Sequence, residues 1–304
     1  MSRGPESSYR MGIDLGGTKT EVLVLDAGGE PVYRRRVDTP AHSYTQILAM
    51  VGELVAGAES EIGQGVSVGI GIPGAISPVS GRLRNSNTVC LNGTEFDRDL
   101  ETGLGRPVRI ENDANCFALS EARRGAARDY GLVFGVIVGT GTGGGIVIDG
   151  KLVNGPNAIG GEWGHNPLPW LRAEDGEPAC YCGKTACIET FLSGPGMARN
   201  YEVRYGRALT SREIVAAAGA GDDSCSAMLD IYHDQMARAL ASLINILDPQ
   251  AIVIGGGMSN IESIYLELPR RLPAYVFSDF VATPVLRAEH GDASGVYGAA
   301  MLWE

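Results

Sequence analysis

The segment MGIDLGGTKTEVLVLD, residues 11–26, decides the fold, because two apolar, strand-like runs flank a turn of glycine and threonine. The segment LVFGVIVGTGTGGGIVID, residues 132–149, repeats this scheme. Each hairpin is followed by a short turn with Asp and Gly that leads into another strand, which in the second copy lies near 151–153. Such a repeat within one chain predicts two similar lobes that face one another.

Outside the repeat, helical and strand-like patterns alternate, which is typical of an α/β protein. From the repeat, we assign residues 1–112 to a smaller N-terminal lobe, completed by a C-terminal helix in 292–304, and residues 113–291 to a larger lobe. The first ten residues, rich in serine, glycine and charge, are expected to be a disordered lead-in. The other expected elements are strands at 65–72, 108–111 and 251–254, and helices at 44–59, 113–124, 226–247, near 262 and at 294–302.

Composition excludes several classes of protein. The net charge of −11 argues against a general nucleic-acid or membrane-surface role, because the excess of Lys and Arg that neutralises phosphates is absent. We find no apolar run near the length of about 18 residues that a membrane helix needs, and no charged-then-apolar leader. A cytoplasmic protein is therefore expected. Six cysteines, three of them clustered, fit a reducing compartment with one metal site better than a disulfide framework.

The segment from Gly161 to Cys187 combines candidate metal ligands with carboxylates. One histidine and three cysteines match the tetrahedral, four-ligand coordination that Zn2+ prefers. Any one of these cysteines alone would more simply be a small buried residue or half of a disulfide. Because the surrounding residues are poor in core-forming side chains, we favour a zinc site over a disulfide. The candidate ligands are His165, Cys180, Cys182 and Cys187.

The two glycine loops suit an oxygen-rich anion, because small residues let backbone N–H groups approach it and Thr hydroxyls add donors. The run Gly139–Gly143 opens like a dinucleotide-binding fingerprint, but the next segment, 145–148, is strand-like instead of helical. Gly183–Thr185 resemble the end of a Walker loop, G-x-x-x-x-G-K-S/T. This loop is excluded, because Pro178 occupies the position of its first glycine. A plain hairpin turn explains either loop alone, whereas two such loops favour a nucleotide held between the lobes.

Asp113 is the best candidate for a general base, the group that accepts the proton of the nucleophile in phosphoryl transfer. It lies in the stretch 111–115 at a strand-to-helix junction, near the positive end of the helix. Helix capping by Asp113 or Asn112 is the simpler explanation in isolation, and both roles are compatible. Asp14 is a candidate outer-shell partner of Mg2+, with a turn-forming aspartate as the ordinary alternative.

Together these motifs resemble the ROK family of bacterial sugar kinases, from about Gly12 to the C-terminus, and most of all its fructokinases that also accept mannose. The resemblance implies an actin/hexokinase/Hsp70-like (ribonuclease H-like) α/β fold with two lobes, duplicated β-sheet cores and an inserted zinc-binding segment. The motifs that carry it are Gly12–Lys19 (GIDLGGTK), Gly69–Gly74 (GIGIPG), Asn112–Asn115 (NDAN), Gly161–Trp170 (GEWGHNPLPW), Cys180–Lys184 (CYCGK), Cys187–Thr190 (CIET), and Asn245–Pro249 (NILDP) leading into Gly255–Met258 (GGGM).

This resemblance implies transfer of the terminal phosphoryl group of ATP to the 6-hydroxyl of a hexose, with D-fructose as the main expectation. A glucokinase or an N-acetylhexosamine kinase of the same family is the alternative. Asp113 is implied to be the base, and His165 to bind a structural Zn2+ through one ring nitrogen and the sugar through the other. The residues implied to bind sugar are Asn87, Asn112, Glu162, His165 and Glu189, and those implied for ATP and Mg2+ are Asp14, Gly16, Gly17, Thr18, Lys19, Gly139, Thr140, Gly141, Thr142, Gly256 and Gly257.

The sequence also departs from the family pattern. Ala186 stands where glycine is usual before the third cysteine, and the stretch 85–88 lacks the Ser-Pro-Asn-Leu form, which bears on the sugar that fits. Related sugar-responsive repressors carry a helix-turn-helix domain, for which the ten residues before Met11 leave no room. A catalytically silent sugar-binding module is a further alternative, which the presence of Asp14 and Asp113 disfavours. The family resemblance also implies a homodimer.

Overall fold

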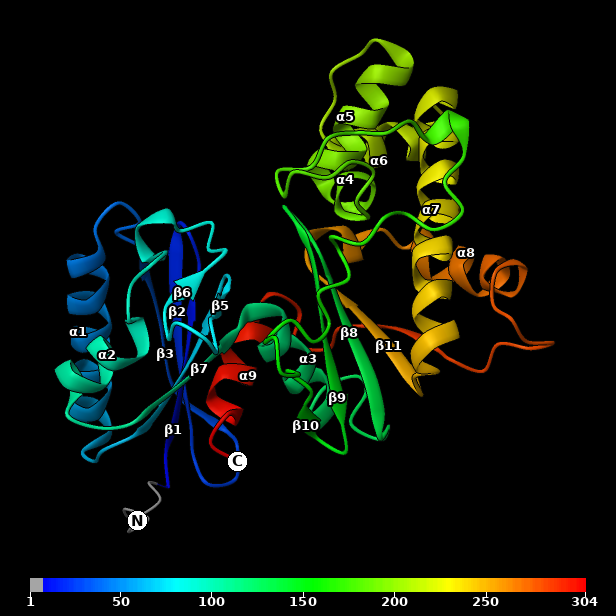
Figure 1. The fold of residues 1–304 in the computed structure, drawn as a ribbon. Coiled ribbons are helices and arrows are strands. Elements are labelled where there is room, and N and C mark those ends of the chain that lie inside the picture. The colour runs from blue at the N-terminus through cyan, green and yellow to red at the C-terminus, as the bar shows by residue number, and fades with distance from the viewer. Residues whose placement is uncertain (1–7) are drawn as a thin grey trace. The chain divides into compact units, whose positions relative to one another are not determined.

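The computed structural model describes residues 8–304, which form an α/β protein with two five-stranded sheets (Figure 1). Of the expected disordered lead-in, residues 1–7 lie outside the described residues, whereas Arg10 already belongs to a strand. Among the helices of residues 8–304, none is both long and apolar enough to cross a membrane. The chain divides into two compact units: unit 1 comprises residues 1–120, 154–160 and 293–304, and unit 2 comprises residues 121–153 and 161–292.

The sheet of unit 1 has the strand order β3-β2-β1-β4-β7. β1 and β2 form the hairpin expected from residues 11–26, and β3 extends it as an antiparallel meander. β4 and β7 continue the sheet in parallel with β1 and are reached through helices, as parallel strands require. The strands are β1 (Arg10–Leu15), β2 (Lys19–Leu25), β3 (Pro31–Asp38), β4 (Ser67–Ile72) and β7 (Val108–Asn112), and the connecting helices are α1 (Tyr44–Ile62) and α2 (Phe96–Leu104).

Helices cover both faces of this sheet (Figure 1), which explains why β1 and β4 are almost continuously apolar. On one face, α1 contributes its buried apolar stripe to the core. On the other face, α9 (Ser294–Met301) packs directly on the backbone of β1 and β4. A Cβ on Gly12 would lie 2.0 Å from the carbonyl oxygen of Val296, and one on Gly69 would lie 1.9 Å from that of Ala299. This close approach requires glycine at both positions.

Unit 2 repeats the arrangement of unit 1, with the strand order β10-β9-β8-β11-β12. β8 and β9 form the second expected hairpin, β10 extends it, and β11 and β12 run parallel to β8. Because the two sheets correspond strand by strand, the predicted duplication of the sheet core is confirmed. The strands are β8 (Leu132–Val138), β9 (Thr142–Ile148), β10 (Lys151–Leu152), β11 (Ala251–Gly255) and β12 (Val285–Arg287).

The long helix α7 (Asp223–Leu247) contributes most of the helical core of unit 2. It begins at Asp223 instead of residue 226, because the side chain of Asp222 caps it by accepting the N–H of Cys225 at 3.0 Å. It ends at Leu247 and is followed by Asp248, which has a left-handed φ of 44°, and then by Pro249. The further elements used below are α3 (Asp113–Arg123), α4 (Glu189–Leu192), α5 (Gly194–Tyr205), α6 (Ser211–Gly219) and α8 (Ser263–Arg271).

The glycine contacts predict opposite effects of two Gly→Ala substitutions. Gly69→Ala should lower the free energy of unfolding by about 1–3 kcal/mol, because its methyl group collides with the backbone of α9. Gly52→Ala, inside α1 with no atom within 4 Å of the added Cβ, should raise it by about 0.5–1 kcal/mol. Urea denaturation of both variants measures the shifts. An unchanged or increased stability of Gly69→Ala would contradict the close packing of α9.

Candidate functional site

Asp113 is the first residue of α3 and directly follows Asn112, the last residue of β7. The side-chain oxygens of both residues lie within hydrogen-bonding distance of the N–H of Ala114, at 2.9 Å from Asn112 and 2.8 Å from Asp113. The amide nitrogen of Asn112 also donates to the carbonyl oxygen of Gly74 at 3.1 Å. The expected capping contacts are therefore present, and Asp113 is half-buried.

Asp14, near the end of β1, lies close enough to Asp113 for their charges to interact. The pKa of Asp14 is raised to about 7, mainly by burial and also by the negative charges of Asp113 and Glu21, against an opposing effect of Arg36. Asp14 and Asp113 repel each other when both are ionised. A bound divalent cation would offset this repulsion and favour the ionised form of both carboxylates. The donor chemistry of this pair therefore fits the predicted Mg2+.

The first glycine loop, between β1 and β2, exposes Gly17 and Thr18. A Cβ on Gly17 would lie 3.7 Å from the hydroxyl of Thr88 and 3.9 Å from the amide oxygen of Asn87, so the predicted sugar residue Asn87 borders this loop. The hydroxyl of Thr88 is buried and has no hydrogen-bond partner within residues 8–304. Thr88 is therefore a candidate that the sequence patterns did not identify. Lys19 forms an ion pair with Asp38.

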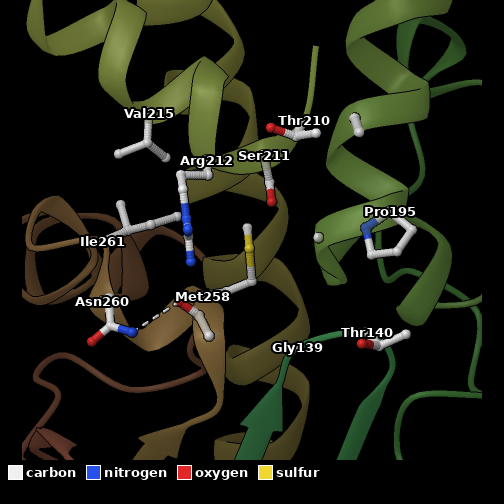
Figure 2. Close-up of a pocket in the computed structure, with 13 residues that line it drawn as sticks. Gly139, Thr140, Pro195, Thr210, Ser211, Arg212, Val215, Met258, Asn260 and Ile261 are labelled. Atoms are coloured by element: carbon white, nitrogen blue, oxygen red, sulfur yellow. Dashed lines mark hydrogen bonds between the residues drawn. The ribbon is translucent and has the colours of Figure 1, made fainter. Parts of the chain in front are cut away.

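The second glycine loop, between β8 and β9, borders a cavity of about 580 Å³ in unit 2 (Figure 2). Three of the residues predicted for ATP, namely Gly139, Thr140 and Gly257, line this cavity. Gly141, Thr142 and Gly256 do not line it. Gly256 instead has a φ of +80° and packs on β8. The lining residues that sequence patterns missed come from α5, α6 and the turn after β11: Gly194, Pro195, Ala198, Thr210, Ser211, Arg212, Val215, Met258, Asn260 and Ile261.

The four predicted metal ligands converge in unit 2. The ligand atoms of His165, Cys180, Cys182 and Cys187 all lie within 4.8 Å of one another. The Sγ atoms of Cys182 and Cys187 are 3.6 Å apart, and Cys180 Sγ lies 3.6 Å from Nδ1 of His165. These separations match the edge of about 3.7 Å expected for a tetrahedron of ligands around Zn2+, and they exceed a disulfide bond of about 2 Å. Geometry and donor chemistry therefore both fit a structural zinc ion.

Ala186, which replaces the usual glycine, adopts a left-handed φ of 54°. The conformation of this turn therefore favours glycine, and the alanine costs about 1 kcal/mol. The carbonyl group of Ala186 accepts the N–H of Leu168 at 2.9 Å, which ties the cysteine turn to the segment after His165.

His165 directs its two ring nitrogens to different partners. Nδ1 faces Cys180, whereas Nε2 lies 2.9 Å from the hydroxyl of Tyr181 and 4.0 Å from a carboxylate oxygen of Glu162. Sequence patterns did not identify Tyr181, because it lies between two cysteines as an ordinary spacer. The pKa of Tyr181 is raised to about 12, first by partial desolvation of its hydroxyl and then by the charges of Glu189, Cys180 and Glu162. Tyr181 therefore stays protonated beside the residues predicted to bind sugar.

The two predicted sugar-binding glutamates lie close to His165 and to each other. Partial burial raises the pKa of Glu162, with an opposing effect of His165 and a further increase from Glu189. Glu189 Oε2 accepts the backbone N–H of Thr142 at 2.9 Å, so this carboxylate also contacts the second glycine loop. Glu162, His165 and Glu189 thus gather in unit 2, while Asn87, Asn112 and Asp113 belong to unit 1.

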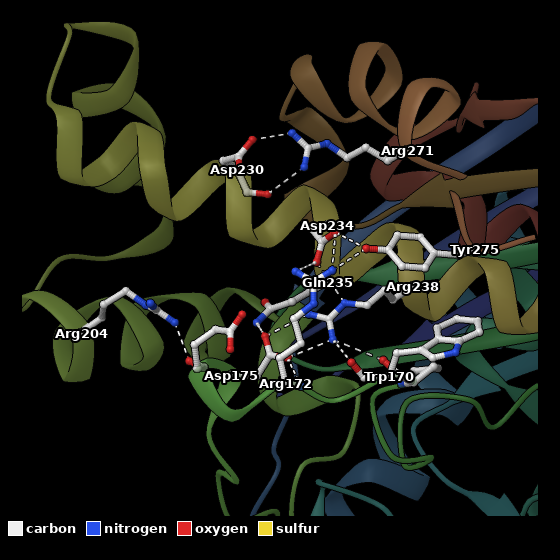
Figure 3. Close-up of polar contacts among 12 residues, drawn as sticks. Trp170, Arg172, Asp175, Arg204, Asp230, Asp234, Gln235, Arg238, Arg271 and Tyr275 are labelled. Carbon is white, nitrogen blue, oxygen red and sulfur yellow. Dashed lines mark hydrogen bonds and ion pairs between the residues drawn. The ribbon is translucent and has the colours of Figure 1, made fainter. Parts of the chain in front are cut away.

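A buried ion cluster holds the segment between His165 and Cys180 against α7 (Figure 3). The side chain of Arg238 is 1% exposed and donates to the two carboxylate oxygens of Asp175 at 2.9 and 3.0 Å. It also donates to the carbonyl oxygen of Trp170 at 2.9 Å and to Asp234 at 3.0 Å. These charge-assisted bonds satisfy the buried guanidinium group and fix the loop that carries metal ligands at both ends.

The convergence of the four ligands predicts that each chain binds one zinc ion and that loss of any of the three thiols weakens its binding. Cys182→Ser should lower the zinc content and the thermal unfolding temperature, because oxygen is a poorer partner for Zn2+ in this site. Cys90→Ser, whose thiol lies outside the cluster, is the matched control and should keep the zinc. Elemental analysis of the purified proteins measures both. Equal metal content in the two variants would refute this zinc site.

The raised pKa of Asp14 predicts a pH dependence of stability. Its folded pKa of about 7 exceeds the value of about 3.9 expected in the unfolded chain. Between these values unfolding releases a proton, so the free energy of unfolding falls as pH rises, and the loss is complete above the folded pKa. Asp14→Asn should remove this dependence and be more stable than the wild type at about pH 8. Urea denaturation in metal-free buffer tests this, and parallel pH profiles of both proteins would contradict it.

Comparison with known proteins supports the family resemblance. The model of the ROK family matches residues 10–304. An N-acetyl-D-glucosamine kinase from Pectobacterium atrosepticum is 42% identical over 296 residues, which cover 96% of this chain and 97% of that relative. The crystal structure of a ROK hexokinase from Thermus thermophilus has a TM-score of 0.86 and 33% identity, and it covers 96% of this chain and 97% of its own.

A ROK family glucokinase from Streptomyces griseus, solved in complex with glucose and AMPPNP, has a TM-score of 0.77 and 27% identity, covering 97% of this chain and 98% of its own. These neighbours confirm the predicted hexokinase-like α/β fold with two sheets. The family match spans nearly the whole chain, and the relatives are similar over almost their full lengths. This chain therefore belongs to the ROK family, as a sugar kinase.

Proposed function

We propose that this sugar kinase transfers the terminal phosphoryl group of ATP to the 6-hydroxyl of an N-acetylhexosamine, with N-acetyl-D-glucosamine as the preferred substrate. The observation that carries this choice is the 42% identity to an N-acetyl-D-glucosamine kinase across 96% of the chain. The fructokinase-like motifs in the sequence favoured D-fructose, but these relatives support the N-acetylhexosamine alternative better. A homodimer remains a prediction from the family resemblance.

Asp113 acts as the general base in this proposal. Its place at the N-terminus of α3, directly after a strand of the sheet, keeps the carboxylate close to the positive end of a helix, which favours its charged form. From there it takes the proton of the sugar hydroxyl as that oxygen attacks the phosphoryl group. Asp14 contributes to holding Mg2+, which offsets negative charge on the phosphates. The interaction between the two carboxylates supports this division of roles.

The sugar hydroxyls are held by Glu162, His165 and Glu189, with Asn87 and Asn112 as further donors and acceptors. The zinc ligands support this assignment, because a metal on Nδ1 of His165 fixes the ring and leaves the proton on Nε2. His165 would then offer one directed donor at Nε2, which a sugar hydroxyl would share with the hydroxyl of Tyr181 at 2.9 Å, and the two carboxylates offer acceptors. Such a mixture suits a sugar, whose hydroxyl groups both donate and accept hydrogen bonds.

ATP binds in the cavity of unit 2 in this proposal. Its volume of about 580 Å³ lies within the usual range of small-molecule sites, roughly 300–1,000 Å³. At one end of the cavity, Thr140 brings a hydroxyl group beside the small residues Gly139 and Gly257, which suits phosphates. Val215, Met258 and Ile261 supply apolar surface for the base (Figure 2).

The proposal predicts the order of sugar preference. N-acetyl-D-glucosamine should have a catalytic efficiency at least about 10-fold above that of D-glucose and D-fructose, because a site built for the acetamido group leaves polar groups unpaired with other hexoses. A coupled ADP-release assay across a panel of hexoses measures kcat/KM for each. Highest efficiency with fructose would overturn the substrate assignment, and no sugar-dependent turnover would support a silent sugar-binding module.

The proposed base has its own test in the same assay. Asp113→Asn should lower kcat by about 100-fold or more, because an amide cannot accept the proton, while sugar binding is retained. Asp129→Asn, an exposed residue outside the site, is the control for a change of charge. Near-wild-type turnover of Asp113→Asn would remove Asp113 from the role of base.

A further inference from the structure

The second glycine loop is held at both ends by one short segment, residues 189–194. The carbonyl oxygen of Gly139 accepts the N–H of Gly194 at 2.8 Å. At the other end of the loop, the N–H of Thr142 donates to Glu189 Oε2 at 2.9 Å. The backbone of the loop is therefore positioned by residues that immediately follow the metal ligand Cys187.

The carboxylate of Glu189 is in contact with this loop at Gly141 and Thr142. A Cβ on Gly141 would be 2.8 Å from Glu189 Oε2, so an alanine there would require this carboxylate to move. The hydroxyl of Thr142 is buried, with 4% of the residue exposed, and has no hydrogen-bond partner among the described residues. The glutamate is thus the side chain that orients the peptide group between Gly141 and Thr142.

The backbone of the same glutamate, Glu189, is hydrogen-bonded to a residue next to the proposed sugar-binding His165. Its backbone N–H donates to the carbonyl oxygen of Gly164 at 2.9 Å, next to His165. Its charge also raises the pKa of Glu162 and of Tyr181, so it lies close to both. One carboxylate oxygen contacts the loop, which leaves the other oxygen as an acceptor for a sugar hydroxyl.

We propose that Glu189 is a positioning residue that couples the binding of sugar to the binding of nucleotide. This inference rests on the proposed function, because it takes the loop as a phosphate contact and Glu189 as a sugar contact. A sugar hydroxyl that binds one oxygen fixes the carboxylate, and the fixed carboxylate orders the loop through Thr142. The second ligand then pays a smaller entropy cost for ordering the loop. Each substrate therefore tightens the binding of the other, and thermodynamic linkage makes the two factors equal.

The matched comparison is between Glu189 and Glu162. Both are carboxylates of the proposed sugar set, but among the contacts of the described residues only that of Glu189 reaches the glycine loop. Glu189→Ala and Glu162→Ala should therefore weaken sugar binding alike and differ in nucleotide binding. Glu189→Gln is the second variant, in case the truncation disturbs folding. Zinc content and thermal unfolding of each protein show whether the metal site and fold persist.

The experiment measures the dissociation constant of AMPPNP by titration calorimetry, with and without saturating N-acetyl-D-glucosamine. In the wild type, sugar should tighten AMPPNP binding by about 3-fold to 10-fold, the scale of one or two hydrogen bonds. Glu189→Ala should weaken sugar-free AMPPNP binding by a similar factor and bring the coupling factor close to one. Glu162→Ala should leave sugar-free AMPPNP binding unchanged.

The outcomes separate this inference from the proposed function. If the wild type binds AMPPNP and sugar but without coupling, or if the Glu189 and Glu162 variants bind sugar-free AMPPNP equally well, the role of Glu189 is overturned. The kinase assignment would stand in either case. If the wild type binds no AMPPNP at all, the proposed function fails first, and the coupling fails with it.

Discussion

The pairing register of two hairpins is the constraint on which the arrangement of candidate site residues depends. In unit 1, Leu15 pairs with Thr20, which leaves the glycines of the first loop at the carboxyl end of β1. Because β4 and β7 run parallel to β1, Asp113 follows β7 at the same edge of the sheet. In unit 2, the pair of Val138 and Thr142 closes the second loop at the edge where β11 leads into Gly257. A shift of one residue would turn these side chains to the opposite face.

Local sequence signals were sufficient for the outline of the fold. The two hairpins, the parallel strands β4, β7 and β11, and the helix before Pro249 all come from short-range patterns of apolar residues and turns, whereas the short strand β12 was not expected. The ion cluster of Arg238 with Asp175 and Asp234 could not be predicted, because it joins a loop to a helix more than 50 residues further along the chain. An arginine on a helix normally indicates a solvated face, and only the folded chain shows that this one is buried.

The candidate site was predictable where residue type alone limits the chemistry. Three thiols and one imidazole have few uses in common, so the metal cluster was found from spacing, and the ligand atoms do converge. Contacts between residue types that occur throughout proteins, such as tyrosine, threonine and glutamate, could not be predicted from the sequence in this way. Tyr181 beside His165 and the bond from Thr142 to Glu189 depend on side-chain orientation, which residue spacing does not specify. These two contacts nevertheless decide which hydrogen-bonding positions remain free for a substrate.

The stretch 85–88, which departs from the family form, is held by side-chain hydrogen bonds. Ser86 stands where the family form has proline, and its N–H donates to the side chain of Asn92 at 2.8 Å, a bond that proline could not form. Asn92 donates back to the carbonyl oxygen of Ser86 at 2.9 Å, and the hydroxyl of Ser86 accepts the N–H of Thr88 at 3.1 Å. Side-chain hydrogen bonds, instead of a proline ring, therefore position Asn87 beside the first glycine loop. The position of Asn87 therefore depends on side-chain contacts of Ser86 and Asn92 that a proline at residue 86 could not make.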